Sequence, residues 1–124
     1  MDKKFTVWPQ IEVNLTQQDI DDIMATALES GITYWCCAVE VVGGYLGEYA
    51  SDQISRGGML KLYDSESNDH YWLDRNDFLR GVKLYFEEGF HVKVENNRID
   101  VADIDANDAD CIIQFALFGE VIYG

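Results

Sequence analysis

A short hairpin signal in the middle of the chain constrains the fold more than any other feature. Residues 59–64 and 70–73 are two largely apolar and aromatic segments, and the turn-forming run SESND separates them. Segments of this kind, joined by so short a polar run, pair as antiparallel strands. The chain is therefore expected to fold around an antiparallel sheet.

Three segments with the apolar spacing of amphipathic helices surround this hairpin. Each begins at a residue that can cap a helix N-terminus, and these residues are Thr16, Asp74 and Asp105. Each ends at a glycine that can adopt the left-handed conformation of a C-cap, and these glycines are Gly31, Gly89 and Gly119. The pattern predicts three helices, with Phe78 on the buried stripe of the second.

The remaining segments are expected to be strands or turns. Residues 5–15 alternate as a bent or edge strand interrupted by Pro9, and residues 32–42 are rich in β-branched and aromatic residues, which predicts a central strand. Residues 49–56 suit two helical turns before a glycine pair. Residues 91–105 contain an Asn-Asn turn and form either a second small hairpin or a long ordered loop. The last five residues are expected to add an edge strand.

This order predicts an α+β fold, an antiparallel sheet with about three helices packed on one face. The 124 residues suffice for one domain with a real core, so we expect residues 1–124 to form a single compact unit. There is no apolar run of signal-peptide or membrane-span length, which predicts a cytosolic protein that does not enter membranes. The odd count of three cysteines indicates reduced thiols.

The charge limits the classes of partner. Nine basic and 23 acidic residues give a net charge of -14, which disfavours binding to long DNA or RNA. Such a surface could instead imitate nucleic acid toward a basic protein, although solubility is the commoner reason for it.

Metal and catalytic motifs are weak in this sequence. Asp103, Asp105 and Asn107 match the first, third and fifth positions of a calcium loop. The match fails at the sixth position, where Asp108 replaces the required glycine, and at the twelfth, where Gln114 replaces the bidentate glutamate. Helix capping explains these aspartates better. No nucleophile motif is present, so we expect neither an enzyme nor a metal or other cofactor.

The four arginines and the many aromatic residues indicate the most specific binding hypothesis. Arg56 and Arg98 lie in turns flanked by glycine or asparagine, where a guanidinium can make bidentate contacts to a phosphate. The aromatic residues are more numerous than core filling needs, and a Tyr or Trp ring could stack on a nucleobase; they are Tyr34, Trp35, Tyr49, Tyr71, Trp72, Phe78 and Tyr85. A helix N-terminus would add a third element of an anion site. Simple solvation of each arginine is an equally good interpretation.

Three segments resemble a known family: LTQQDIDDIMATALESGITYWC, GEYASDQISRGGMLKLYD and the C-terminal DADCIIQFALFGEVIYG. They are similar to the phage Thoeris anti-defence sponges, small proteins of Firmicutes phages and prophages. The resemblance implies a non-enzymatic protein that sequesters cyclic ADP-ribose isomers made by bacterial TIR-domain defence enzymes, in the host cytoplasm. Some relatives also hold cyclic oligonucleotides. It further implies homodimers with ligand pockets at the subunit interface, which can join into hexamers.

The resemblance also suggests site residues. Arg56 in the SRGG turn is the candidate for a cyclic-oligonucleotide contact. Arg98 and Asp100 are the candidates for the phosphates and ribose hydroxyls of a cyclic ADP-ribose. Asn76 and Phe78, at the start of the second long helix, are the candidates for hydrogen bonding and stacking to adenine.

Two other classes of function remain open from the residues. The runner-up is an acidic, DNA-mimic-like inhibitor of a basic host defence protein, such as an anti-restriction or anti-CRISPR protein. The third is a virion structural protein that assembles into particles.

Overall fold

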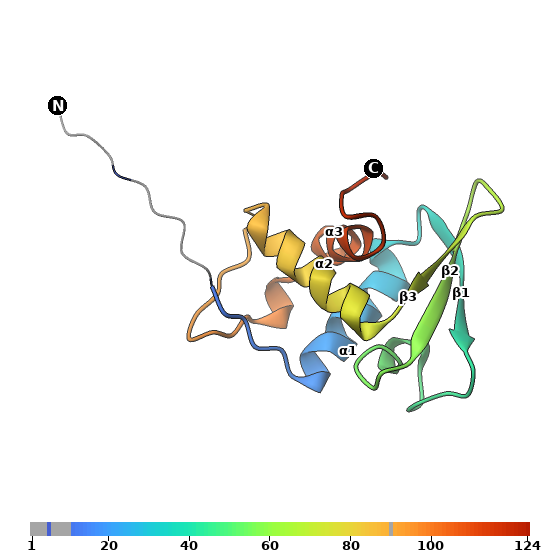
Figure 1. Ribbon diagram of the computed structural model, residues 1–124, viewed down its shortest axis with the longest axis horizontal. Coiled ribbons are helices and arrows are strands. Elements are labelled where there is room, and N and C mark those ends of the chain that lie inside the picture. The colour runs from blue at the N-terminus through green and yellow to red at the C-terminus, as the bar shows by residue number, and fades with distance from the viewer. Residues whose placement is uncertain (1–4, 6–10, 90) are drawn as a thin grey trace.

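The sheet has three antiparallel strands in the order β1-β2-β3 (Figure 1). The computed structural model describes residues 5, 11–89 and 91–124. Strand β1 spans Cys36–Val42, β2 spans Met59–Asp64 and β3 spans His70–Leu73. The β2–β3 hairpin confirms the signal of the SESND turn. Because β2 is the middle strand, the expectation that residues 32–42 form the central strand was wrong. Those residues form a turn followed by an edge strand.

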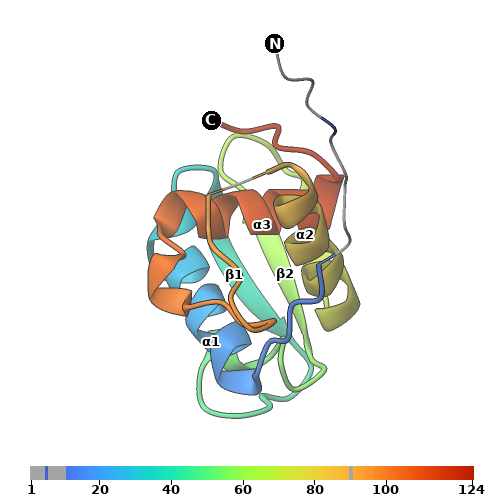
Figure 2. The same ribbon diagram turned by 90° about the vertical axis from the view of Figure 1, so that its left-hand side faces the viewer.

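Three α-helices cover one face of this sheet (Figures 1 and 2). They are α1 (Gln17–Thr26), α2 (Arg75–Glu87) and α3 (Ala106–Phe118). Short helical turns accompany them: the π-helix η1 (Ala27–Gly31) and the 3-10 helices η2 (Ala50–Asp52) and η3 (Val101–Asp103). The predicted α+β architecture, with helices on one side of an antiparallel sheet, is confirmed, and the described residues form one compact unit.

The N-terminal caps are as the sequence predicts. The side chains of Thr16, Asp74 and Asp105 each accept the backbone N–H of the aspartate three residues further on. The side chain of that aspartate accepts the backbone N–H of the N-cap residue in return. These capping boxes define where α1, α2 and α3 begin. The C-terminal glycines Gly89 and Gly119 have φ values of 79° and 73°, as a left-handed stop requires.

Gly31 has a different role from the predicted helix stop. The helix continues through Gly31 as η1, and Gly31 has no positive φ. A Cβ there would lie 2.7 Å from the carbonyl oxygen of Ala106 at the start of α3. The glycine is therefore needed for close packing of η1 against α3, not for backbone conformation.

The core lies between the helices and the inner face of the sheet. Leu60, Leu62 and Leu73 point inward from β2 and β3 and are fully buried. Large side chains from the three helices meet them, including Ile23, Met24, Phe78, Tyr85, Ile112 and Ile113. The apolar stripes that predicted the helices are the faces that they bury.

Several other segments differ from the sequence-based expectation. Residues 11–15 form no strand, and residues 6–10 of the predicted strand lie outside the described residues. Residues 49–56 form only η2 and turns. In residues 91–105 one antiparallel bridge joins Glu95 to Arg98 around an Asn-Asn turn, and an ordered loop with η3 follows. The last five residues form no strand, because the amides of Ile122 and Tyr123 donate to the Gln114 side chain.

Candidate functional site

The start of α1 brings together the two arginines that the sequence singled out. Arg98 donates from Nη2 to Asp19 Oδ2 at 2.9 Å, and Arg56 donates from Nη1 to Asp21 Oδ2 at 3.3 Å. Asp19 and Asp21 lie two residues apart in the first turns of α1. Two turns that are distant in the sequence therefore present their guanidinium groups along one helix.

A third arginine joins this group through the SRGG turn. The Ser55 hydroxyl donates to Asp21 Oδ1 at 2.5 Å, and Arg75 donates from Nη1 to the Ser55 carbonyl at 3.2 Å. Arg75 is the first residue of α2. We call Arg56, Arg75 and Arg98 the arginine group. No sequence pattern selects Arg75, because only the tertiary fold brings the start of α2 to this turn.

The guanidinium groups are partly available to a ligand. The Arg98 side chain is 48% exposed and the Arg56 side chain is 33% exposed. Their carboxylate partners are more buried, which keeps each ion pair ordered at the surface. An incoming phosphate must therefore share the arginines with these carboxylates or displace them.

The other predicted ligand residues divide between surface and core. Asn76 is exposed as the second residue of α2, next to Arg75. Asp100 is exposed as well, and its Oδ1 caps η3 by accepting the amide of Ala102 at 3.0 Å. Phe78 is fully buried in the core, so its ring has no free face for adenine, and its assignment as a stacking residue was wrong. The helical periodicity had placed Phe78 correctly, on the buried stripe.

The starts of α1 and α2 are poor anion sites, because their own aspartates cap them. Asp19 accepts the Thr16 amide at 2.9 Å while Thr16 Oγ1 accepts the Asp19 amide, and Asp74 with Asp77 repeats the arrangement on α2. Side-chain oxygens therefore already occupy two of the backbone N–H groups at each helix start, and the capping carboxylates repel an anion there. The arginine side chains are the better donors to an anion at this surface.

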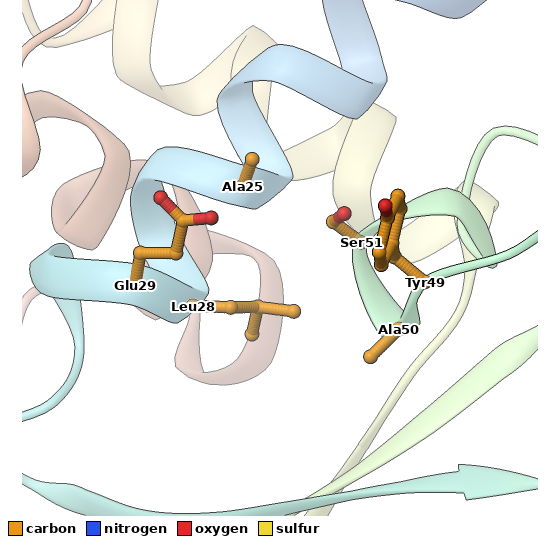
Figure 3. A pocket seen from close by; sticks show the side chains of 6 residues that line it. All are labelled: Ala25, Leu28, Glu29, Tyr49, Ala50 and Ser51. Carbon is orange, nitrogen blue, oxygen red and sulfur yellow. The ribbon is translucent and has the colours of Figure 1, made fainter.

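A small pocket lies beside the Arg56 turn, between α1 with η1 on one side and η2 on the other (Figure 3). Ala25, Leu28 and Glu29 face Tyr49, Ala50 and Ser51 across a volume of about 180 Å³. Its lining is mostly apolar. Tyr49 is 61% exposed, so one ring at the pocket is free to stack on a planar group.

Asp52 connects this pocket to Arg56. Its carboxylate accepts the amides of Glu48 and Tyr49, each at 3.0 Å, and the amide of Tyr49 is the main reason that the pKa of Asp52 is lowered. Its carbonyl accepts Arg56 Nη1 at 3.0 Å. One residue thus fixes both the pocket wall and the arginine. The sequence did not predict this pocket; the feature that could have pointed to it is an aromatic residue, Tyr49, directly after a glycine-rich loop.

The cysteines and the aspartates near α3 do not form an activated site. Burial raises the pKa of the Cys36 and Cys111 thiols, which is the opposite of what a nucleophilic cysteine needs. Cys36 packs in the core as expected, whereas Cys37 lies exposed at a β-bulge. Asp105 of the calcium-like run caps α3, and the described residues contain no group of three potential metal ligands.

A second, larger cleft of about 730 Å³ lies at the other end of the sheet strands, next to the C-terminal segment. Aromatic rings and carboxylates line it, including Tyr34, Tyr71, Tyr123, Asp64 and Asp69. None of the arginine group lines this cleft. The described residues therefore offer two separate candidate sites, one that presents arginines and one that presents carboxylates and aromatic rings.

Comparisons with protein-family models, with curated proteins and with solved structures found no match to this chain. Among the described residues no helix is both long enough and apolar enough to cross a membrane.

Proposed function

We propose that this chain is a non-enzymatic phage protein that binds and sequesters a cyclic ADP-ribose isomer, and so silences a bacterial TIR-domain (Thoeris) defence in the host cytoplasm. The observation that carries the proposal is that Asp52 holds both Arg56 and the pocket wall at Tyr49, while Arg98 pairs with Asp19 at the other end of α1 from the pocket. Phosphate needs cationic donors, and a base needs an apolar slot with a free ring. Cyclic oligonucleotides contain the same two kinds of group, so a cyclic trinucleotide is a further candidate ligand.

Each candidate residue has a chemical task in this proposal. Arg56 and Arg98 donate to phosphate oxygens, and Asp100 accepts from ribose hydroxyls. Asn76 hydrogen-bonds the base. Tyr49 takes over the stacking task that the buried Phe78 cannot perform. No step of covalent chemistry and no cofactor is involved, because sequestration requires affinity alone.

The negative net charge is compatible with an anionic ligand. Exposed charges farther away than a Debye length, roughly 8 Å at physiological salt, are largely screened. The local field at the site depends on Arg56, Arg75 and Arg98 and on their partners Asp19 and Asp21.

The test combines ligand identification with one matched pair of variants. Mass spectrometry of small molecules released by heating the purified protein should find a cyclic nucleotide. Calorimetric titration with cyclic ADP-ribose isomers should then show tight binding that Arg98→Ala abolishes. Arg80→Ala is the control, since Arg80 bonds to Asp77 and to the Ala116 carbonyl, away from α1. Unchanged affinity of Arg98→Ala would remove this site assignment.

We also propose that the protein works as a homodimer, and that dimers can join into hexamers. The outer face of the sheet supports this, because Val42 and Trp72 are exposed there beside Tyr63 and Lys61. Exposed apolar side chains on one sheet face are suited to association. Light scattering after size-exclusion chromatography should give twice or six times the mass of the 14.2 kDa chain. A monomer at micromolar concentration would contradict it.

The second candidate function is an acidic decoy for a basic host defence protein. The observation that favours it is that Asp19, Asp21 and Asp52 pair with Arg56 and Arg98, so these two cations are not free to offset the net charge of -14. A decoy should co-purify with a nuclease and lose affinity steeply as salt rises. A sponge needs no protein partner, so these two outcomes separate the functions.

A further inference from the structure

The larger cleft is formed where the β2–β3 turn meets the C-terminal segment. Figure 2 shows these two parts of the chain side by side, and the Tyr123 hydroxyl bonds to Asp64 at the end of β2. The volume of about 730 Å³ falls within the range of about 300 to 1,000 Å³ that is usual for small-ligand sites. The cleft is therefore large enough for a small organic group.

One wall of the cleft is the Tyr123 side chain, which several contacts fix in position. Its ring stacks on Trp35 with centroids 4.7 Å apart and planes 2° from parallel. Its hydroxyl donates to Asp64 Oδ2 at 2.6 Å and lies 3.1 Å from the Tyr71 hydroxyl. Its backbone amide donates to Gln114 Oε1 at 2.8 Å. These contacts hold the wall in place without a ligand.

The opposite side of the cleft is held by a buried carboxylate. Asp110 is only 6% exposed and accepts from the Tyr34 hydroxyl at 2.6 Å, Trp35 Nε1 at 2.8 Å and Gln114 Nε2 at 2.9 Å. The Tyr34 hydroxyl thus donates into the protein interior. Its ring stays 54% exposed, so the cleft presents a π-face there.

The charge of the cleft has one sign. The carboxylates of Asp64, Glu66 and Asp69 line it, and the described lining residues include no lysine, arginine or histidine. The hydrogen bond from the Tyr123 hydroxyl lowers the pKa of Asp64, which keeps that carboxylate ionised. Aromatic faces attract cations through their quadrupole, and carboxylates add charge and hydrogen-bond acceptors. An anion meets repulsion from the same groups.

We propose that this cleft binds an organic cation, a primary ammonium or guanidinium group held between the rings of Tyr34, Tyr71 and Tyr123 and the carboxylates of Asp64 and Asp69. The cation can belong to a free polyamine or to a lysine or arginine side chain of a protein partner. The proposal does not depend on nucleotide binding, because it uses none of the residues in the arginine group.

The experiment titrates the full chain with spermidine and, in a second arm, with short peptides that carry one lysine or one arginine. The cleft variant is Glu66→Gln with Asp69→Asn, whose side chains are exposed, so the fold should survive. The control is Glu87→Gln with Glu88→Gln, which removes the same charge at the end of α2. A third variant, Tyr34→Leu, tests the ring at constant charge.

We expect at least one probe to bind the parent protein, with shifts of the Tyr34 and Tyr71 ring resonances. The cleft variant should bind about tenfold more weakly and the control within about twofold. Spermidine binding without peptide binding identifies a free polyamine, and the reverse identifies a partner side chain. Binding of neither probe, or equal losses in the cleft and control variants, would overturn the proposal.

Discussion

Asp19 Oδ2 accepts both the Thr16 amide that begins α1 and the Arg98 guanidinium from a turn far along the chain. One carboxylate oxygen therefore serves a local helix cap and a tertiary ion pair. The residue is 8% exposed, so neither interaction is fully screened by water. The stability of the helix start and the position of the candidate phosphate ligand are coupled through this side chain.

Asp19→Asn separates these two tasks. Asparagine keeps an oxygen that can accept the Thr16 amide but loses the charge that attracts Arg98. We expect the free energy of unfolding to fall by about 1 kcal/mol. If Arg98 binds phosphate, the affinity for a cyclic nucleotide should rise, because the competing carboxylate is gone.

Urea unfolding and calorimetry measure the two effects, and Asp22→Asn on the same helix is the control. Asp22 accepts only from Gln18 Nε2 among the hydrogen bonds that the structure shows, so its replacement should change stability by less than about 0.5 kcal/mol. A loss of nucleotide affinity in Asp19→Asn would argue against Arg98 as a phosphate ligand.

Gly81 is a point of close approach between α2 and α3. A Cβ added there would lie 2.8 Å from Ala116 Cβ and 2.9 Å from its amide nitrogen, and would also collide with the Ile112 carbonyl. Because backbone cannot move aside cheaply, Gly81→Ala should lower the free energy of unfolding by about 1 to 3 kcal/mol. Helix propensity alone predicts the opposite sign.

The control for Gly81→Ala is Gly44→Ala. A Cβ at Gly44 meets nothing within 4 Å, and its φ is not positive. Its thermal midpoint should stay close to that of the parent protein. Equal midpoints for both variants would show that α2 and α3 can separate without cost.

The parts of the fold that the sequence predicts correctly depend on neighbouring residues. The capping boxes at Thr16, Asp74 and Asp105 and the SESND hairpin are all local, so a short window contains the full signal. The central position of β2 depends on which strands pair, and that choice is made between distant segments. The role of Gly31 depends on Ala106, which belongs to a helix late in the chain.

The same distinction applies to the candidate sites. Arg56 and Arg98 could be selected from their turns, but their meeting on α1 requires the tertiary contacts with Asp21 and Asp19. The cleft beside the C-terminal segment requires the side chain of Gln114, which replaces the backbone pairing expected of an edge strand. No periodicity carries that information.

Gln114 holds the C-terminal segment in place from inside α3. It is fully buried, accepts the amides of Ile122 and Tyr123 at 2.8 Å, and donates to Asp110 at 2.9 Å. Gln114→Met keeps the volume but removes these bonds, which should cost about 1 to 3 kcal/mol. The near-ultraviolet circular dichroism of the Trp35–Tyr123 stack should fall.

Gln18→Met is the matched control, since Gln18 is exposed and its change should alter neither quantity measurably. An unchanged near-ultraviolet spectrum in Gln114→Met would mean that Trp35 and Tyr123 stay stacked without the Gln114 bonds. The stability cost would then come from the lost hydrogen bonds themselves and not from release of the C-terminal segment.

Tyr85 is expected to make the protein less stable as the pH rises into the alkaline range. Its ring is fully buried and its hydroxyl donates to Asp108 Oδ1 at 2.8 Å. Burial, followed by this hydrogen bond, raises the pKa of Tyr85 well above the usual value of about 10. Above pH 10 the unfolded chain loses this proton while the folded protein keeps it. Unfolding then releases a proton, so stability falls as pH rises from about 10 toward the folded pKa.

Urea unfolding at a series of pH values above 9 measures this slope, with Tyr85→Phe as the test and Tyr45→Phe as the control. Tyr85→Phe should be less stable at neutral pH, because Asp108 loses a donor, yet should show a smaller decline with pH. Tyr45 is 61% exposed, and its variant should follow the curve of the parent protein. If the free energy of unfolding of Tyr85→Phe falls with pH as steeply as that of the parent protein, other groups cause the decline. Tyr34 is the first of these to test, because its pKa is raised to about 12.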